Sequence, residues 1–70
     1  MHNIEETAKL LKALADKTRL KILECIQTGV SNPGDMAGKL KRHRSTVEKH
    51  LRVLLKAGII EKVPSLTKDG

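Results

Sequence analysis

Residues 1–30 place their apolar side chains at the three- and four-residue spacing of amphipathic helices. Asn3 is the expected N-cap of a first helix of about three turns, because its side chain can accept a hydrogen bond from a free backbone N–H group. Asp16 is the expected N-cap of a second helix, which Gly29 ends as a left-handed C-cap. The apolar side of this second helix contains Leu20, Ile22, Leu23 and Ile26. The pattern therefore predicts two short helices before residue 30.

Residues 32–57 predict a third and a fourth helix joined by a brief connection. Asn32 is the expected N-cap of the third helix, and Pro33 suits its first position, where no N–H donor is needed. Residues 41–43 form the connection, and the fourth helix follows over residues 44–57 until Gly58. The apolar stripe of the fourth helix contains Val47, Leu51 and Leu54. A short helix, a tight turn and a longer helix make a helix-turn-helix.

The spacing changes after Gly58, where apolar and polar residues begin to alternate. Ile59, Glu61 and Val63 share one side of this segment, which predicts a β-strand from residue 59. Asp69-Gly70 is a hairpin-turn signal, but no second strand follows, so we expect an excised fragment or an abbreviated wing. The predicted fold is mainly α: a single winged helix-turn-helix domain over residues 1–70, with four helices and a short, truncated β wing.

The charge of the chain is concentrated in its middle. The 70 residues carry a formal net charge of +6, and residues 31–58 hold seven Lys and Arg against two Asp and Glu. A local basic surface of this kind favours a polyanionic partner, although a solvated face that serves solubility has the same composition. The chain contains no Phe, Tyr or Trp, which excludes readers of single-stranded nucleic acid that stack bases on aromatic rings. Double-stranded DNA is the polyanion that fits.

Other features of the sequence narrow the class of protein further. The single cysteine, Cys25, lies among apolar residues and predicts a buried thiol, which fits a reducing cytoplasm. His43 and His50 have no third ligand at a suitable spacing, so we expect no metal site and no cofactor. No apolar run is long enough to cross a membrane. Catalytic motifs are also missing, and we therefore expect a cytoplasmic protein that is not an enzyme.

The fourth helix presents polar and basic side chains opposite its apolar stripe, as a helix in the major groove requires. Arg44 and Ser45 lie in its first turn, the part that usually reaches base edges. Ser45 and Thr46 could instead cap the helix, and Glu48 could accept from cytosine or pair with Arg44 or Arg52. The candidate DNA-binding residues are Lys39, Lys41, Arg42, His43, Arg44, Ser45, Thr46, Glu48, Lys49 and Arg52.

The segments LADKTRLKIL, DMAGKL and STVEKHLRVLLKAGIIEK, taken in this order, resemble the ArsR-type winged helix-turn-helix regulators of bacteria and archaea. The resemblance covers about residues 11–62 and implies a dimeric transcriptional regulator, most simply a repressor, that binds operator DNA. It also implies that Ser45, Thr46, Lys49 and His50 belong to the recognition helix. Asn32 and Gly34 stand where metal-sensing members have a pair of cysteines.

Two further departures from the family concern the turn and the dimer. Lys41 and Arg42 replace the glycine and apolar residue that many members have in the turn, and the family's C-terminal dimerisation helix has no counterpart before Gly70. The first helix has more apolar surface than one packing contact needs, so we expect a homodimer to form through it. The candidate dimerisation residues are Ile4, Ala8, Leu11 and Ala15. The alternative is a winged-helix protein-interaction module that uses the same apolar helix.

Overall fold

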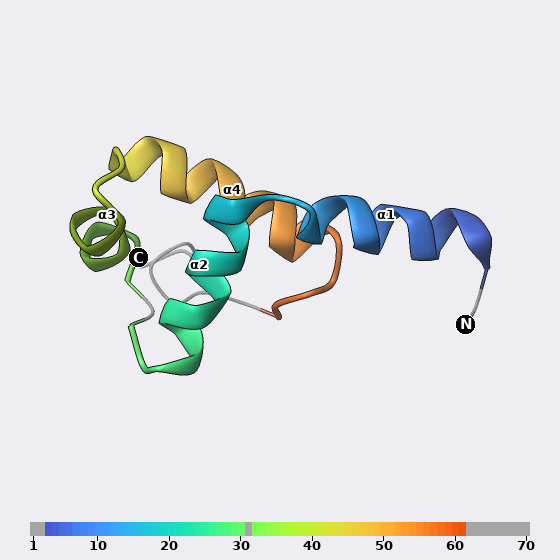
Figure 1. Cartoon of the computed structure of the whole chain (residues 1–70), viewed down its shortest axis with the longest axis horizontal. Coiled ribbons are helices and arrows are strands. Elements are labelled where there is room, and N and C mark those ends of the chain that lie inside the picture. The colour runs from blue at the N-terminus through green and yellow to red at the C-terminus, as the bar shows by residue number, and fades with distance from the viewer. Residues whose placement is uncertain (1–2, 31, 62–70) are drawn as a thin grey trace.

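The computed structural model describes residues 3–30 and 32–61, and these contain four helices (Figure 1). They are α1 (Ile4–Leu14), α2 (Lys17–Gln27), α3 (Pro33–Leu40) and α4 (Arg44–Lys56). All four predicted helices are confirmed, and α4 ends one residue before the predicted limit at residue 57. None of the helices in the described ranges is long and apolar enough to cross a membrane.

The N-termini of α1, α2 and α3 are each closed by the predicted side chain. Asn3 Oδ1 accepts from the backbone N of Glu6 at 2.7 Å, and Asp16 Oδ1 accepts from the backbone N of Arg19 at 3.1 Å. Asn32 Oδ1 accepts from two backbone N–H groups of α3, at 2.7 and 3.2 Å. These bonds satisfy donors that have no partner within the helix, which explains why each helix begins where it does.

The turn between α3 and α4 contains a lysine in the left-handed conformation. Lys41 has φ 57° and ψ 47°, and its backbone N–H donates to the carbonyl of Ala37. Glycine is the usual residue in this position because a Cβ atom makes the conformation costly. The lysine therefore stands in the turn at some expense in folding stability.

The core lies between α2, α3 and α4. Its buried members come from all three helices and are Ile22, Cys25, Met36, Val47, Leu51 and Leu54. The predicted burial of Cys25 is confirmed, since only 4% of the residue is exposed. Leu20, by contrast, was predicted on the apolar side of its helix but is 50% exposed, because α2 turns Ile22 and Cys25 toward α3 and α4.

The first helix stands apart from this core. Figure 1 shows α1 extending away from the other helices, which it joins at its C-terminal end. Ala13 is the buried residue of α1, whereas Ile4 is 83% exposed and Leu11 63%. Ala8 and Ala15 are exposed as well. The candidate dimerisation residues are thus all exposed: Ile4, Ala8 and Leu11 lie in α1, and Ala15 is its C-cap.

The predicted β wing is wrong in its first residues. Residues 59–61 form bends, and the remainder of the predicted wing, from residue 62, lies outside the described residues. The backbone N–H of Ile59 donates to the carbonyl of Leu54 at 3.0 Å, and that of Ile60 to the same carbonyl at 3.5 Å. These donors continue the hydrogen bonding of α4, and both side chains pack against the core. The alternating pattern at this point reflects a helix end folded back on the core.

Candidate nucleic-acid interface

The longest helix, α4, is completely buried on one side and exposed on the other. Val47, Leu51 and Leu54 each have 0% of their surface exposed, because α2 and α3 cover them. The opposite side of the helix is open to solvent and carries Ser45, Lys49 and Arg52. Arg44 is exposed as well, but at the start of the helix and on the side of Val47. Packing on one side therefore fixes the direction in which the polar side chains project.

The other candidate residues lie beside this exposed side or in the turn before it. Lys39, Lys41, Arg42 and His43 are exposed, and Thr46 and Glu48 are half-buried. His43 is the N-cap of α4, so neither hydroxyl of the first turn takes that position. Glu48 Oε2 lies 3.2 Å from Arg44 Nε, so of the two alternatives for Glu48 the pairing with an arginine one turn away is present in the structure.

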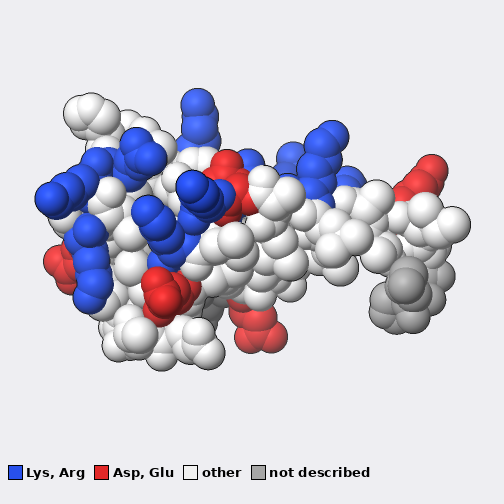
Figure 2. All heavy atoms as spheres, in the orientation of Figure 1, with Lys and Arg blue, Asp and Glu red and all other residues white. Residues whose placement is uncertain are grey.

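The basic residues gather over the end of the molecule formed by the helix-turn-helix. Figure 2 shows Lys and Arg side chains spread over the region of α2, α3 and the first part of α4, with acidic side chains in smaller number among them. A second group of basic side chains lies toward α1. The first group covers the same part of the surface as the exposed side of α4, so charge and shape coincide there.

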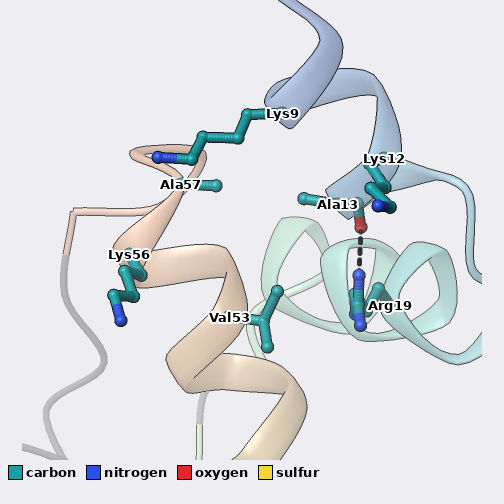
Figure 3. A pocket seen from close by; sticks show the side chains of 7 residues that line it. All are labelled: Lys9, Lys12, Ala13, Arg19, Val53, Lys56 and Ala57. Carbon is teal, nitrogen blue, oxygen red and sulfur yellow. Dashed lines mark hydrogen bonds between the residues drawn. The ribbon is translucent and has the colours of Figure 1, made fainter. Parts of the chain in front are cut away.

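Arg19 connects α2 to both α1 and α4. Its Nη1 donates to the backbone carbonyl of Ala13 at 3.1 Å, as Figure 3 shows, and its Nε donates to Nδ1 of His50 at 3.2 Å. The backbone N–H of Arg19 and the nearby His50 both lower the pKa of Asp16, the former more strongly. A single side chain in α2 thus holds the end of α1 and the middle of α4 in place.

A cavity of about 470 Å³ lies where α1, α2 and α4 meet (Figure 3). Ala13, Val53 and Ala57 supply apolar walls, and the remaining lining residues are Lys9, Lys12, Arg19 and Lys56. The cavity adjoins the C-terminal part of α4, away from the first turn that carries Arg44 and Ser45. It marks the junction through which α1 is joined to the helix-turn-helix.

A second hollow adjoins the turn before α4. It is lined by Thr18, Lys41, Arg42, His43, Thr46 and His50. The bond to Arg19 places His50 at the boundary between α2 and α4. No role for Thr18 or Arg19 was predicted from the sequence. The sequence did contain one signal for this hollow. Thr46 and His50 are four residues apart, so their side chains lie in one row beside the buried stripe.

No group of three or more His, Cys, Asp and Glu suited to a metal ion occurs among residues 3–30 and 32–61. Asn32, which stands where metal-sensing relatives have a cysteine, uses its side-chain oxygen to cap α3. Cys25 is a free thiol in the core, among apolar residues.

A family profile described as "Helix-turn-helix domain" matches residues 14–63. The chain is 36% identical over 62 residues to the uncharacterized HTH-type transcriptional regulator MJ1325 of Methanocaldococcus jannaschii. The aligned residues make up 87% of this chain and 70% of MJ1325. The chain belongs to the ArsR-type helix-turn-helix transcriptional regulators. The names of these relatives describe transcriptional regulators and not enzymes.

Among the ArsR-type relatives, the HTH-type transcriptional regulator CmtR of Mycobacterium tuberculosis (strain ATCC 25618 / H37Rv) is 43% identical over 53 residues. The CmtR of Mycobacterium bovis has the same identity over the same length. The match covers 76% of this chain and 45% of CmtR, so the chain spans less than half the length of those relatives. No solved structure shows a significant match to this chain.

Proposed function

We propose that this domain binds operator DNA sequence-specifically, with α4 lying in the major groove. The observation that carries the proposal is the two-sided environment of α4, whose buried stripe fixes an exposed face of Ser45, Lys49 and Arg52, with Arg44 exposed in the first turn. The major groove is about 12 Å wide and accepts one helix. A rigidly packed helix with outward cations and hydroxyls meets that requirement.

The contacts divide into those to bases and those to phosphates. Arg44 and Ser45 lie in the first turn of α4, from which side chains of a recognition helix reach base edges. Lys39, Lys41 and Arg42 flank that turn and are suited to phosphates, which carry most of the affinity but no sequence information. Glu48 pairs with Arg44, so its first effect is to orient that guanidinium group.

We further propose that the domain acts as a homodimer through α1. Ala13 faces the other helices, while the row of Ile4, Ala8, Leu11 and Ala15 is exposed. An apolar row of this kind on a small domain marks a contact surface. A second copy is the occupant that the function favours, because two-fold pairing brings two recognition helices to successive major grooves about 34 Å apart.

The regulatory outcome that we propose is repression in the cytoplasm. A small domain that occupies an operator excludes other proteins from the same DNA, whereas activation requires a further contact with the transcription machinery. The competing function is a protein-interaction module that uses α1 for a different partner. The net charge of +5 on residues 31–58 favours DNA, because binding a protein partner through α1 would not explain a basic helix-turn-helix.

Binding to duplex DNA over a range of salt concentrations tests the proposal. The logarithm of the binding constant should fall with the logarithm of salt concentration by about 0.9 for each phosphate contact. Arg52→Gln should weaken binding and reduce this slope. Lys56→Gln removes the same charge from the last turn of α4, beside the cavity near α1, and should leave binding almost unchanged. Salt-independent binding, or equal effects of the two variants, would contradict the proposal.

A further inference from the structure

The hollow beside the turn gathers hydrogen-bond donors from three parts of the chain. Thr18 belongs to α2, residues 41–43 form the turn, and Thr46 and His50 belong to α4. Two of the lining side chains are cations, two are imidazoles and two are hydroxyls, and none is acidic. Asp16 is not among the lining residues, and its carboxylate accepts from the backbone N–H of Arg19. The composition of this hollow fits an anion with several oxygen atoms.

The hydrogen bond from Arg19 determines which nitrogen of His50 carries a proton. Arginine Nε is always a donor, so the Nδ1 atom that it contacts at 3.2 Å must accept. A neutral imidazole with an accepting Nδ1 carries its proton on Nε2. Because the second bond of Arg19, to the carbonyl of Ala13, holds the guanidinium group in place, the ring is fixed in this tautomer. His50 therefore presents an N–H donor at the edge of the ring that Arg19 does not occupy.

We propose that this hollow, which we call the phosphate seat, binds one phosphate of the DNA backbone. The Nε2–H of His50, the hydroxyls of Thr18 and Thr46 and the charge of Arg42 would receive its oxygens. Arg19 is a positioning residue, because it orients His50 and does not touch the DNA. The inference rests on the proposed function and adds to it a contact beside the groove, next to the first turn of α4. Backbone phosphates border the groove at that place when a helix enters it.

The test compares two substitutions of His50 in duplex binding. His50→Leu removes the donor and should weaken binding to every duplex by about tenfold, which is typical of one hydrogen bond to a charged group. His50→Gln restores an N–H at nearly the position of Nε2 and should bind within about twofold of the unchanged protein, by the same reasoning. The salt dependence should stay the same in both, because the contact is made by a neutral ring. Lys41→Gln, in contrast, should reduce the slope by about 0.9.

The positioning of His50 by Arg19 can be measured separately, through the tautomer of the His50 ring. Nitrogen NMR of the free protein should find His50 protonated on Nε2, and a mixture of both tautomers in Arg19→Gln. Arg19→Gln should weaken DNA binding alone but add nothing in a His50→Leu background, since both substitutions remove the same contact. Circular dichroism establishes that each variant is folded. If Arg19→Gln does not fold, the tautomer of the unchanged protein still decides the point, and a proton on Nδ1 overturns the inference.

The outcomes separate this inference from the proposed function. If the unchanged protein fails to bind duplex DNA, the proposed function is wrong and the phosphate seat falls with it. If the protein binds duplex DNA and folded His50→Leu binds equally well, the phosphate seat alone is overturned. Equal losses for His50→Leu and His50→Gln would also overturn it, because they would indicate a packing effect.

Discussion

Lys41 occupies a backbone position that is usually glycine, which lowers the folding stability but places a positive charge in the turn. Its φ of 57° lies in the left-handed region, where a Cβ atom costs about 1–2 kcal/mol. Glycine would remove that cost but lose more conformational entropy on folding, about 0.5–1 kcal/mol. A positive charge beside the phosphate seat is the corresponding benefit, since Lys41 lines that hollow.

We therefore expect Lys41→Gly to raise the free energy of unfolding by up to about 1 kcal/mol while weakening DNA binding. Lys41→Gln keeps the Cβ atom and removes the charge, so it should weaken binding without the gain in stability. Denaturant unfolding measures the first quantity, and titration of duplex DNA the second. The interpretation of Lys41 is wrong if the glycine variant is no more stable than the glutamine variant.

Asp16 makes the stability of the domain sensitive to acid. Its pKa is lowered from 3.8 in the folded protein, mainly by the backbone hydrogen bond from Arg19. A carboxyl group with a lowered pKa stabilises the fold fully above its unfolded-state pKa and loses this effect as the pH falls through the folded value. Asp16→Asn keeps an oxygen that can cap the helix but has no charge to titrate.

The midpoint temperature of the unchanged protein should exceed that of Asp16→Asn at neutral pH. The difference should shrink as the pH falls below 3.8, because protonation then removes the charge from Asp16 as well. Thermal unfolding followed by circular dichroism at several pH values measures it. A difference that stays constant down to the lowest pH would show that the charge of Asp16 has no part in stability.

At the scale of single elements, features decided by neighbouring residues were predictable from the sequence. The caps Asn3, Asp16 and Asn32 bond to backbone atoms two or three residues ahead, and all three were predicted. The predicted strand at Ile59 failed because the choice between a strand and a continued helix end depends on packing against the core. The contact between Arg19 and His50 spans 31 residues, so no local pattern contains it.

The same distinction applies to the candidate interface. The four-residue spacing of α4 located its exposed side, because the buried stripe alone fixes the opposite face. The phosphate seat, by comparison, joins Thr18 of α2 to the turn and to α4, which only the packing of the helices brings together. The exposed side of one helix could therefore be predicted from the sequence, whereas a hollow shared between helices could not.

Leu11 tests the proposed role of α1 as the dimer contact. The residue is 63% exposed and lies on the apolar row away from Ala13, so a charge there should not disturb the core. We expect Leu11→Glu to be a folded monomer with reduced affinity for an operator that has two half-sites. Analytical ultracentrifugation gives the oligomeric state, and DNA titration gives the affinity.

Lys9→Glu is the matched control for Leu11→Glu. It places the same acidic side chain on α1 but beside the cavity formed with α4, off the apolar row. It should leave the oligomeric state unchanged. The dimer contact is not α1 if the unchanged protein is monomeric at high micromolar concentration, or if Leu11→Glu remains dimeric.

At the scale of the whole molecule, a basic helix-turn-helix lies at one end and the exposed apolar side chains of α1 lie at the other. The two helices of the helix-turn-helix, α3 and α4, share one core with α2. The first helix, α1, extends away from that core (Figure 1). The basic side chains of the helix-turn-helix lie over the opposite end from the tip of α1 (Figure 2). Such an arrangement would let two copies pair through α1 while the helix-turn-helix of each copy faces the DNA.

Selection of binding sites from random duplex DNA tests the central claim, sequence-specific reading by α4, most directly. We expect the selection to enrich an inverted repeat whose half-sites lie about one turn of the DNA helix apart, or about 34 Å. Repeating the selection with Arg44→Ala should relax the preference at one position of each half-site, because a single base contact is lost. Retention of DNA without any enriched sequence would contradict the claim, since it would mean that the basic surface binds phosphates alone.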